Sequence, residues 1–301
     1  MSYFGKVNCD YKVGERYEIF SGGDLSVVFI RGAKDSSKLI CTFNSHISGE
    51  RMRLIPELPL KGGWEAEISR SGHSGLFFIS KWNHWFHTRE IGAAIESCEK
   101  ILDGFEKRVV MGASLGGHAA IRLSRRMKAD VVLAISPQFC INPSIVGGFE
   151  RRWRTEHKEI ESYGEPISLD SAIDEVYIIY DDLHLVDARH VFEINRQIPC
   201  QMFSLSDSGH SSVRPMADLR LLERMFELSI EKSGNVRLLN DMKDYYDLNW
   251  MRSPKALQVH ADRLPISERL GFLSGKKDLI GLERHKVELG LYIDKLEKQL
   301  G

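Results

Sequence analysis

A serine stands between two glycines at the point where a strand-like run meets a helix-like run. The stretch Gly112-Ala113-Ser114-Leu115-Gly116 follows an apolar run and opens directly into Gly117-His118-Ala119-Ala120. A serine at such a turn presents its hydroxyl above the sheet edge, and helix amides point into the space beside it. That arrangement suits nucleophilic attack on a carbonyl carbon, with amides that stabilise the resulting oxyanion. An ordinary glycine-rich turn without chemistry is the alternative interpretation.

A serine hydroxyl is a weak nucleophile, so Ser114 needs a base within hydrogen-bond reach. His210 follows the last predicted strand in a Gly-His-Ser turn, and His46 and His84 also follow strands. His118 lies four residues beyond the serine, on the predicted helix. Open α/β sheets bind ligands at the carboxyl ends of their strands. We predict His210 as the base, because it comes after a strand end that bears acidic residues.

Three aspartates crowd the turn after the apolar run 176–180, and one of them is expected to orient the imidazole. Asp181 follows the run directly, so its backbone is the best anchored, and we predict it as the acid. Asp187 is the second choice, because an aspartate before Ala188 is typical of a helix N-cap. Asp182 is expected to point to solvent. The chain order is then Ser, Asp, His, as in one class of enzymes with this serine turn.

The elements that must position these side chains alternate along the chain. Apolar, β-branched runs at 25–30, 39–43, 75–79, 131–135, 176–180 and 200–205, together with the run before Gly112, predict strands. Amphipathic stretches at 88–105, 187–197 and 216–231, together with the stretch after Ser114, predict helices. This alternation predicts an α/β fold with a mostly parallel central sheet and helices on both faces. The first strands are typical of a meander, which predicts an antiparallel edge.

Two segments depart from this alternation. Residues 138–174 form a charged insertion, predicted as a small helical cap on a domain that spans residues 1–232. Residues 233–301 contain no convincing strand and are predicted as a helical C-terminal extension. Apolar residues fall on one stripe of its last helix at Leu282, Leu289, Ile293, Leu296 and Leu300. This stripe either packs on the domain or forms the seam of a homodimer.

Composition excludes several classes of function. The 301 residues are 43% hydrophobic with a net charge of −1, so no global field favours nucleic acid. The chain shows neither a signal-peptide pattern nor an apolar run of bilayer-spanning length. Five scattered cysteines indicate reduced thiols in a cytoplasmic protein. The sequence has no phosphate loop, dinucleotide fingerprint or metal-ligand cluster, so we predict no cofactor and no metal.

The stretch from about 25 to 231 resembles the α/β-hydrolase fold. The resemblance is carried by the Gly112–Gly116 motif, by Asp181 after the later strand, by Gly209-His210 after the last strand, and by the order of elements between them. It implies a nucleophile at Ser114, a base at His210 and an aspartate that orients it. It also implies an oxyanion hole built from the backbone amide of Leu115 and a second donor, most simply Asn44.

Two loops depart from the common pattern of that family. Phe43-Asn44-Ser45-His46 stands where many members have a His-Gly pair, and Leu183 stands at the offset where many place the acid. The segments Asn83-His84-Trp85 and Ser136-Pro137-Gln138 resemble segments of hydrolase-like proteins from bacterial surface-polysaccharide loci.

Substrate contacts are expected from the aromatic and basic residues near these loops. Trp85 and Trp153 could line a pocket for a sugar or an acyl group, although each could simply be half-buried. Arg152 could hold an anionic group of the substrate, although it could also lie on a solvated helix face. We therefore predict a serine hydrolase that cleaves a carboxylic ester of a small molecule, such as an acylated sugar. An acyltransferase with the same residues and a non-catalytic glycan- or protein-binding member of the fold are the alternatives.

Overall fold

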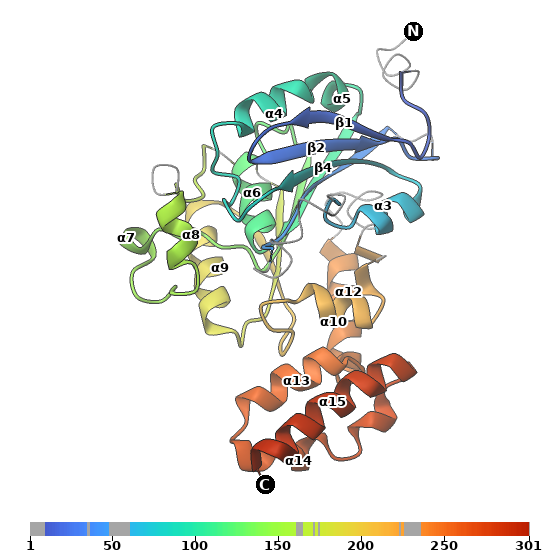
Figure 1. Cartoon of the computed structure of the whole chain (residues 1–301), viewed down its shortest axis with the longest axis vertical. Coiled ribbons are helices and arrows are strands. Elements are labelled where there is room, and N and C mark those ends of the chain that lie inside the picture. The colour runs from blue at the N-terminus through green and yellow to red at the C-terminus, as the bar shows by residue number, and fades with distance from the viewer. Residues whose placement is uncertain are drawn as a thin grey trace.

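The computed structural model describes residues 10–34, 37–47, 61–160, 165–170, 172–173, 175–222, 224–225 and 236–300. Eight strands form one twisted sheet with helices on both faces, and a group of helices lies below it at the C-terminal end (Figure 1). The strands are β1 Arg16–Ser21, β2 Leu25–Ile30, β3 Lys38–Phe43, β4 Ser74–Ser80, β5 Lys107–Ala113, β6 Val131–Ile135, β7 Val176–Tyr180 and β8 Gln201–Ser204.

The strands pair in the order β1-β2-β4-β3-β5-β6-β7-β8. The β1–β2 and β2–β4 pairs are antiparallel, and all the pairs from β4–β3 to β7–β8 are parallel. Each parallel pair is reached through a crossover, which leaves the carboxyl ends of β3, β5, β6, β7 and β8 at one edge of the sheet. This is the strand order of the α/β-hydrolase fold, so the fold class expected from the sequence is confirmed, including the antiparallel edge.

Alternate residues of the central strands supply two separate cores. In β5, Val110 packs with helices on one face, while Val109 and Met111 pack on the other. The first face is covered by α4 Ile91–Ser97, α5 Glu99–Asp103, α6 Leu115–Leu123 and α9 Leu185–Gln197. The second face is covered by α3 Glu65–Ser71, α10 Val213–Asp218 and α12 Val236–Asn249. Burial on both faces explains why these strands are continuously apolar.

The helices differ in detail from the expectation. The helix predicted at 88–105 is two helices, α4 and α5, that meet at Cys98, where the backbone amide bonds to the carbonyls of both Ile95 and Glu96. The helix predicted at 216–231 is interrupted in the structure: α10 begins earlier and ends at Asp218, and residues 221–222 and 224–225 are helical again. Arg220 adopts φ 58°, a left-handed conformation that a helix cannot continue through. The rest of that prediction, from 226 onward, lies outside the described residues.

The described part of the insertion carries the short helices α7 Pro143–Val146 and α8 Arg154–Glu159. Phe139, Cys140, Ile141 and Ile160 are buried with the core of the first face, so much of this segment packs on the sheet domain. Trp153 precedes α8 and is partly buried against the same core.

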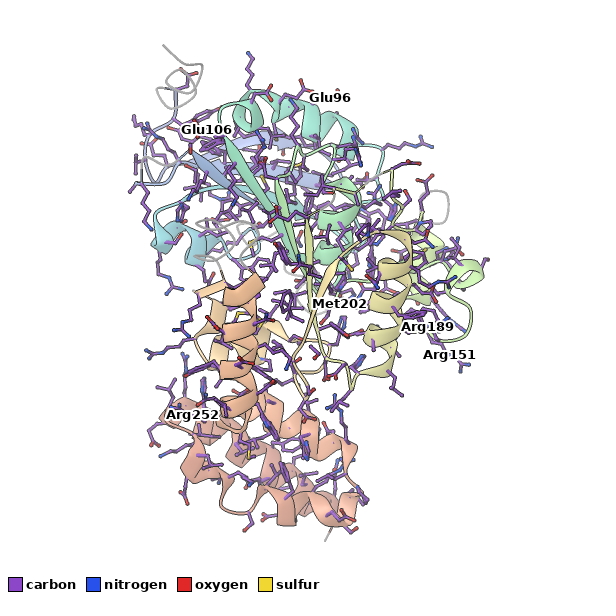
Figure 2. All side chains as sticks on the ribbon, turned by 180° about the vertical axis from the view of Figure 1, so that it is seen from behind. Glu96, Glu106, Arg151, Arg189, Met202 and Arg252 are labelled. Atoms are coloured by element: carbon purple, nitrogen blue, oxygen red, sulfur yellow. The ribbon has the colours of Figure 1, made fainter. Side chains whose placement is uncertain are left out.

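The C-terminal extension is helical as expected, although its predicted boundary at 232 and 233 lies outside the described residues. After α12 come η3 Trp250–Arg252, α13 Pro254–Arg263, α14 Ile266–Leu273, η4 Lys276–Leu279 and α15 Glu283–Leu300. Leu289 and Leu296 of the predicted stripe are buried against α13 and α14 in a small core. Figure 2 shows Arg252 at the junction between α12 and these helices. Within the described part of the chain, none of the helices has the combined length and apolarity that crossing a bilayer requires.

Candidate active site

Ser114 lies between the end of β5 and the start of α6 in a strained conformation. Its φ is 53°, which is unusual for a residue other than glycine. The flanking glycines are required by space. A Cβ on Gly112 would lie 2.2 Å from backbone atoms of Gly116, and one on Gly116 would lie 2.2 Å from the carbonyl oxygen of Phe43. The close approach of strand, helix and the β3 end therefore holds the serine at the carboxyl edge of the sheet.

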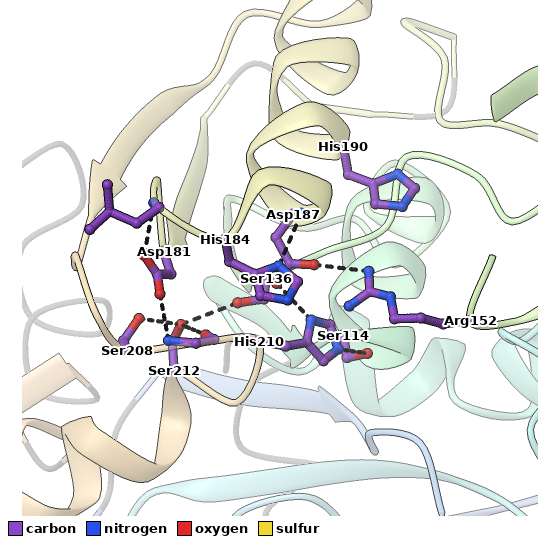
Figure 3. Close-up of polar contacts among 12 residues, drawn as sticks. Ser114, Ser136, Arg152, Asp181, His184, Asp187, His190, Ser208, His210 and Ser212 are labelled. Atoms are coloured by element: carbon purple, nitrogen blue, oxygen red, sulfur yellow. Dashed lines mark hydrogen bonds and ion pairs between the residues drawn. The ribbon is translucent and has the colours of Figure 1, made fainter. Parts of the chain in front are cut away.

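Ser114, His210 and Asp187 form a continuous hydrogen-bonded chain (Figure 3). Oγ of Ser114 lies 2.9 Å from Nε2 of His210, and Nδ1 of His210 lies 2.7 Å from Oδ2 of Asp187. An ionised carboxylate can only accept, so Nδ1 carries the proton and Nε2 is free to accept from the serine hydroxyl. This tautomer is the one that a general base requires.

Asp187 is fully buried and lies in the first turn of α9. The N-cap of this helix is His184 rather than Asp187: Nδ1 of His184 accepts a hydrogen bond from the Asp187 amide at 3.3 Å. Burial alone would raise the pKa of the Asp187 carboxyl, but its side-chain contacts with the His184 and His210 rings outweigh burial and hold the pKa far below its ordinary value. The carboxylate therefore stays ionised beside the imidazole.

Asp181, the acid expected from the sequence, serves a different purpose. Its Oδ1 accepts from the amides of Leu183 and Asp207, and its Oδ2 accepts from the amide of Gly209 at 2.7 Å. Arg263 of α13 forms an ion pair with it. Because Asp181 directly follows β7, these hydrogen bonds connect the loop that carries His210 to the end of that strand. The structure thus places Asp187, the second choice, on the imidazole, and Asp182 is exposed as expected.

The other three candidate bases are engaged elsewhere. Nε2 of His46 lies 3.0 Å from Nδ2 of Asn83 and 3.3 Å from Oε1 of Glu156. His84 is buried against the Asp24 carbonyl, and His118, a buried residue of α6, has its Nδ1 on the Gln138 carbonyl. His210 is the histidine whose ring hydrogen-bonds to the Ser114 hydroxyl.

The two expected oxyanion donors have different outcomes. Leu115 is the first residue of α6, so its amide has no acceptor within the helix. The Asn44 amide donates to the carbonyl of Phe78 at 3.2 Å, and its side chain bonds to Ser80 and Ser45. Asn44 is therefore committed to the sheet. Ser45 follows it and lines the pocket.

A pocket of about 330 Å³ opens beside Ser114 and His210. Its described walls are mainly apolar, with the aromatic rings of Phe43, Trp64 and Trp153. Trp153 was expected in this position. Trp85 is fully buried behind it, with ring centroids 5.2 Å apart, and contributes no exposed surface.

Arg152, expected to hold an anionic substrate group, is instead paired within the protein. Its Nη2 lies 3.0 Å from Oδ1 of Asp187 and 2.7 Å from Oε2 of Glu150. Glu150 in turn accepts a hydrogen bond from His190 at 2.9 Å. The guanidinium, which is 28% exposed, thus pairs with the buried carboxylates of Glu150 and Asp187 rather than standing free for a substrate.

Several residues of this network were missed by sequence reasoning. Gln138 donates to Ser114, and Glu150, His190 and Arg263 hold the loops around it. Only Gln138 had a signal in the sequence, as a polar residue just beyond the apolar run 131–135. No cluster of three or more histidine, cysteine or acidic side chains suited to a metal ion occurs in the described part of the chain.

No protein-family model and no curated protein matches the sequence. Among solved structures, the chain is similar to a capsule O-acetyltransferase of Neisseria meningitidis serogroup A, with 14% identity, 69% of this chain and 92% of that chain covered, and a TM-score of 0.48. It is also similar to Est1E from Butyrivibrio proteoclasticus, with 15% identity, 71% and 97% covered, and a TM-score of 0.45. An esterase of Pyrococcus furiosus has 16% identity, 74% and 91% covered, and a TM-score of 0.45. Likenesses this distant do not assign an activity.

Proposed function

We propose that the protein is a serine esterase in which Ser114, His210 and Asp187 transfer an acyl group. The observation that carries the proposal is the hydrogen-bonded chain from Ser114 Oγ through the His210 ring to Asp187. It occurs at a strained serine, at a helix N-terminus, beside an open pocket. Each of these features alone also occurs in proteins without catalytic activity. Together they meet the geometric requirements of a nucleophile, a base and an orienting acid.

The proposed reaction has two halves. His210 Nε2 takes the Ser114 proton as Oγ attacks the ester carbonyl carbon, and the carbonyl oxygen becomes an oxyanion near the amides of Leu115 and Ser45. The intermediate collapses, the ester C–O bond breaks, and His210 returns the proton to the departing alkoxide. Water then attacks the acyl-enzyme in the same way and releases the acid. Asp187 accepts from Nδ1–H throughout and stabilises the imidazolium.

The pocket supports a small ester as substrate, such as an acylated sugar. Its volume lies at the lower end of the range for small-molecule sites, and aromatic rings such as Trp64 and Trp153 can pack against an acyl chain or a sugar face. With Arg152 turned inward, the anionic subsite expected from the sequence loses its main residue. A location in the cytoplasm, the absence of a nucleic-acid partner and a homodimer through the C-terminal helices stay predictions.

A fluorophosphonate probe tests the proposal, because it labels a serine only when a neighbouring base activates it. We expect stoichiometric labelling at Ser114 and hydrolysis of p-nitrophenyl acetate, both lost in Ser114→Ala. Ser144→Ala, a change at an exposed serine of α7 outside the pocket, is the matched control and should keep both. Labelling that is absent, or that persists in Ser114→Ala, would contradict the proposal and favour a non-catalytic binding protein. An added alcohol acceptor separates hydrolase from acyltransferase, since only the latter transfers the acyl group in preference to water.

A further inference from the structure

Gln138 is a fully buried polar residue whose side chain touches the proposed nucleophile. Its Nε2 lies 3.1 Å from Oγ of Ser114, closer than its Oε1, which lies 3.5 Å from the same atom. The orientation of the carboxamide is fixed by Trp85, because the indole N–H can only donate and lies 3.0 Å from Oε1 of Gln138. The group that faces Oγ is therefore the NH₂, a donor, and the serine oxygen accepts from it.

The backbone around Gln138 is held just as firmly. Its carbonyl oxygen lies 2.9 Å from Nδ1 of His118, and the next amide, that of Phe139, donates to Nδ1 of His190. Burial, reinforced by Arg122, lowers the pKa of His118 to about 3, so its ring is neutral. The Nδ1–H of His118 therefore donates a hydrogen bond to the Gln138 carbonyl, and Nε2 of His118 accepts one from the buried His87 at 2.9 Å.

Backbone strain converges on the same place. Trp85 and Phe86 have φ values of 49° and 55°, and Ser136 and Ser114 have values of 45° and 53°. None of the four is glycine, and such outliers persist only where the surroundings force them, commonly at functional sites. The strain at Trp85 and Phe86 brings the indole to Gln138, and the strain at Ser136 turns the chain after β6 toward Ser114.

We propose that Gln138 is a catalytic residue whose N–H stabilises charge on Ser114 Oγ when that atom is the leaving group in deacylation. This inference rests on the proposed function. In that step water loses a proton to His210 and forms a bond to the acyl carbon. The C–Oγ bond then breaks, its electron pair stays on Oγ, and Oγ takes the proton from His210. Gln138 transfers no proton.

The hydrogen bond should affect the two halves of the reaction unequally. An ester oxygen is a poor acceptor, so the bond from Gln138 is weak in the acyl-enzyme and strengthens as negative charge develops on Oγ. In the free enzyme Oγ is a hydroxyl oxygen that already accepts well, so acylation gains less from the same contact. Only an interaction that is stronger in the transition state than in the ground state accelerates a step.

Gln138→Met tests this, because methionine fills a similar volume without a donor. We expect deacylation of p-nitrophenyl acetate to slow by about 100-fold, the usual cost of one lost donor to a developing charge. Acylation should slow much less. Rapid mixing should then show a burst of one p-nitrophenol per site followed by slow turnover. Gln197→Met, a change at an exposed glutamine of α9, is the matched control and should behave as the unmodified protein.

Equal slowing of both halves would mean a purely structural role, and unchanged rates would mean no role; either result overturns the inference while leaving the proposed function intact. Unmodified protein that neither labels at Ser114 nor turns over would instead overturn both. If Gln138→Met does not fold, Trp85→Phe provides the second test. The Trp85→Phe change removes the indole N–H, so the Gln138 carboxamide is free to rotate. Deacylation should then slow more than acylation. Equal slowing of the two steps, or no slowing of either, would again overturn the inference.

Discussion

Asp187 and His210 are 23 residues apart in the chain, yet Oδ2 of Asp187 lies 2.7 Å from Nδ1 of His210. The other oxygen, Oδ1, lies 3.0 Å from Nη2 of Arg152. Each carboxylate oxygen thus has its own partner. Oδ2 contacts the His210 ring, which is charged only when it gains a second proton, and Oδ1 contacts the Arg152 guanidinium, which is permanently cationic. Both oxygens of the carboxylate are therefore held by a partner, which limits its rotation beside the imidazole.

Asp187→Asn should abolish most of the activity. An asparagine can present an N–H to His210 Nδ1 and so favour the wrong tautomer, which costs about 10⁴-fold in kcat in a comparable triad. Steady-state hydrolysis of p-nitrophenyl acetate measures the loss. Asp182→Asn, a change at the exposed neighbour, is the control and should retain full activity. Activity within tenfold of the unmodified protein in Asp187→Asn would remove it from the proposed mechanism.

Asp181→Asn should lower stability much more than activity. The carboxylate accepts three backbone hydrogen bonds and pairs with Arg263, and losing charged partners of this kind costs about 2 kcal/mol or more. Chemical denaturation measures the free energy of unfolding, and kcat at a temperature below the transition measures the activity. A loss of activity as large as that in Asp187→Asn, with stability unchanged, would restore Asp181 as the acid.

Glu150 should make stability depend on pH in the acid range. Burial would raise the pKa of its carboxyl, but hydrogen bonds from His190 and Arg152 outweigh it and lower the pKa from the ordinary value of 4.5 to about 2. A carboxyl with a depressed folded-state pKa adds stability above its unfolded pKa, and this is lost as pH falls toward the folded value. Glu150→Gln should therefore lower the melting temperature at pH 7, and the difference should shrink between pH 4.5 and pH 2. Glu159→Gln, a change at an exposed residue, should show no such trend; a difference independent of pH would contradict the prediction.

Arg263→Met should impair both the fold and the site, although Arg263 lies far from Ser114 in the chain. The guanidinium pairs with Asp181 and with Asp207, both buried and both at the base of the His210 loop. Removing one partner from such a network leaves unpaired buried charge, at a cost of about 3 kcal/mol. We expect kcat to fall with KM nearly unchanged, because the loop no longer holds the base in one place.

Arg269→Met is the matched control for Arg263→Met, since Arg269 lies on the next helix, α14, and pairs with the exposed Asp262. It should change neither kcat nor the free energy of unfolding appreciably. If Arg263→Met lowers stability but leaves kcat intact, the C-terminal helices contribute to folding alone.

The sequence predicted those features that depend on local pattern. Apolar runs located the strands from β2 to β8 because buried parallel strands have no polar face. Spacing located Ser114, because only glycine fits at 112 and 116. The assignment of the acid could not be predicted this way. Asp181 and Asp187 are both near the end of β7, and which one faces His210 depends on side-chain direction, which spacing does not encode.

Contacts between residues far apart in the chain could not be predicted from the sequence either. Arg152 is as plausible on a solvated surface as in a pocket, and only the fold shows that Glu150 and Asp187 surround it. Gln138 required knowledge that Trp85, from a loop 53 residues earlier, fixes its carboxamide. Such relationships are set by tertiary packing, so they follow from the sequence only after the fold is known.

The ion pair between Arg263 and Asp181 also has a consequence for the order of synthesis. Translation produces Ser114, Asp187 and His210 before α12 and α13, so a growing chain contains every residue of the proposed chemistry while Asp181 and Asp207 still lack their cation. The His210 loop would then gain its final support only after α13 leaves the ribosome. A chain ended by an early stop codon after His210 would contain Ser114, Asp187 and His210 but not the cation that pairs with Asp181 and Asp207.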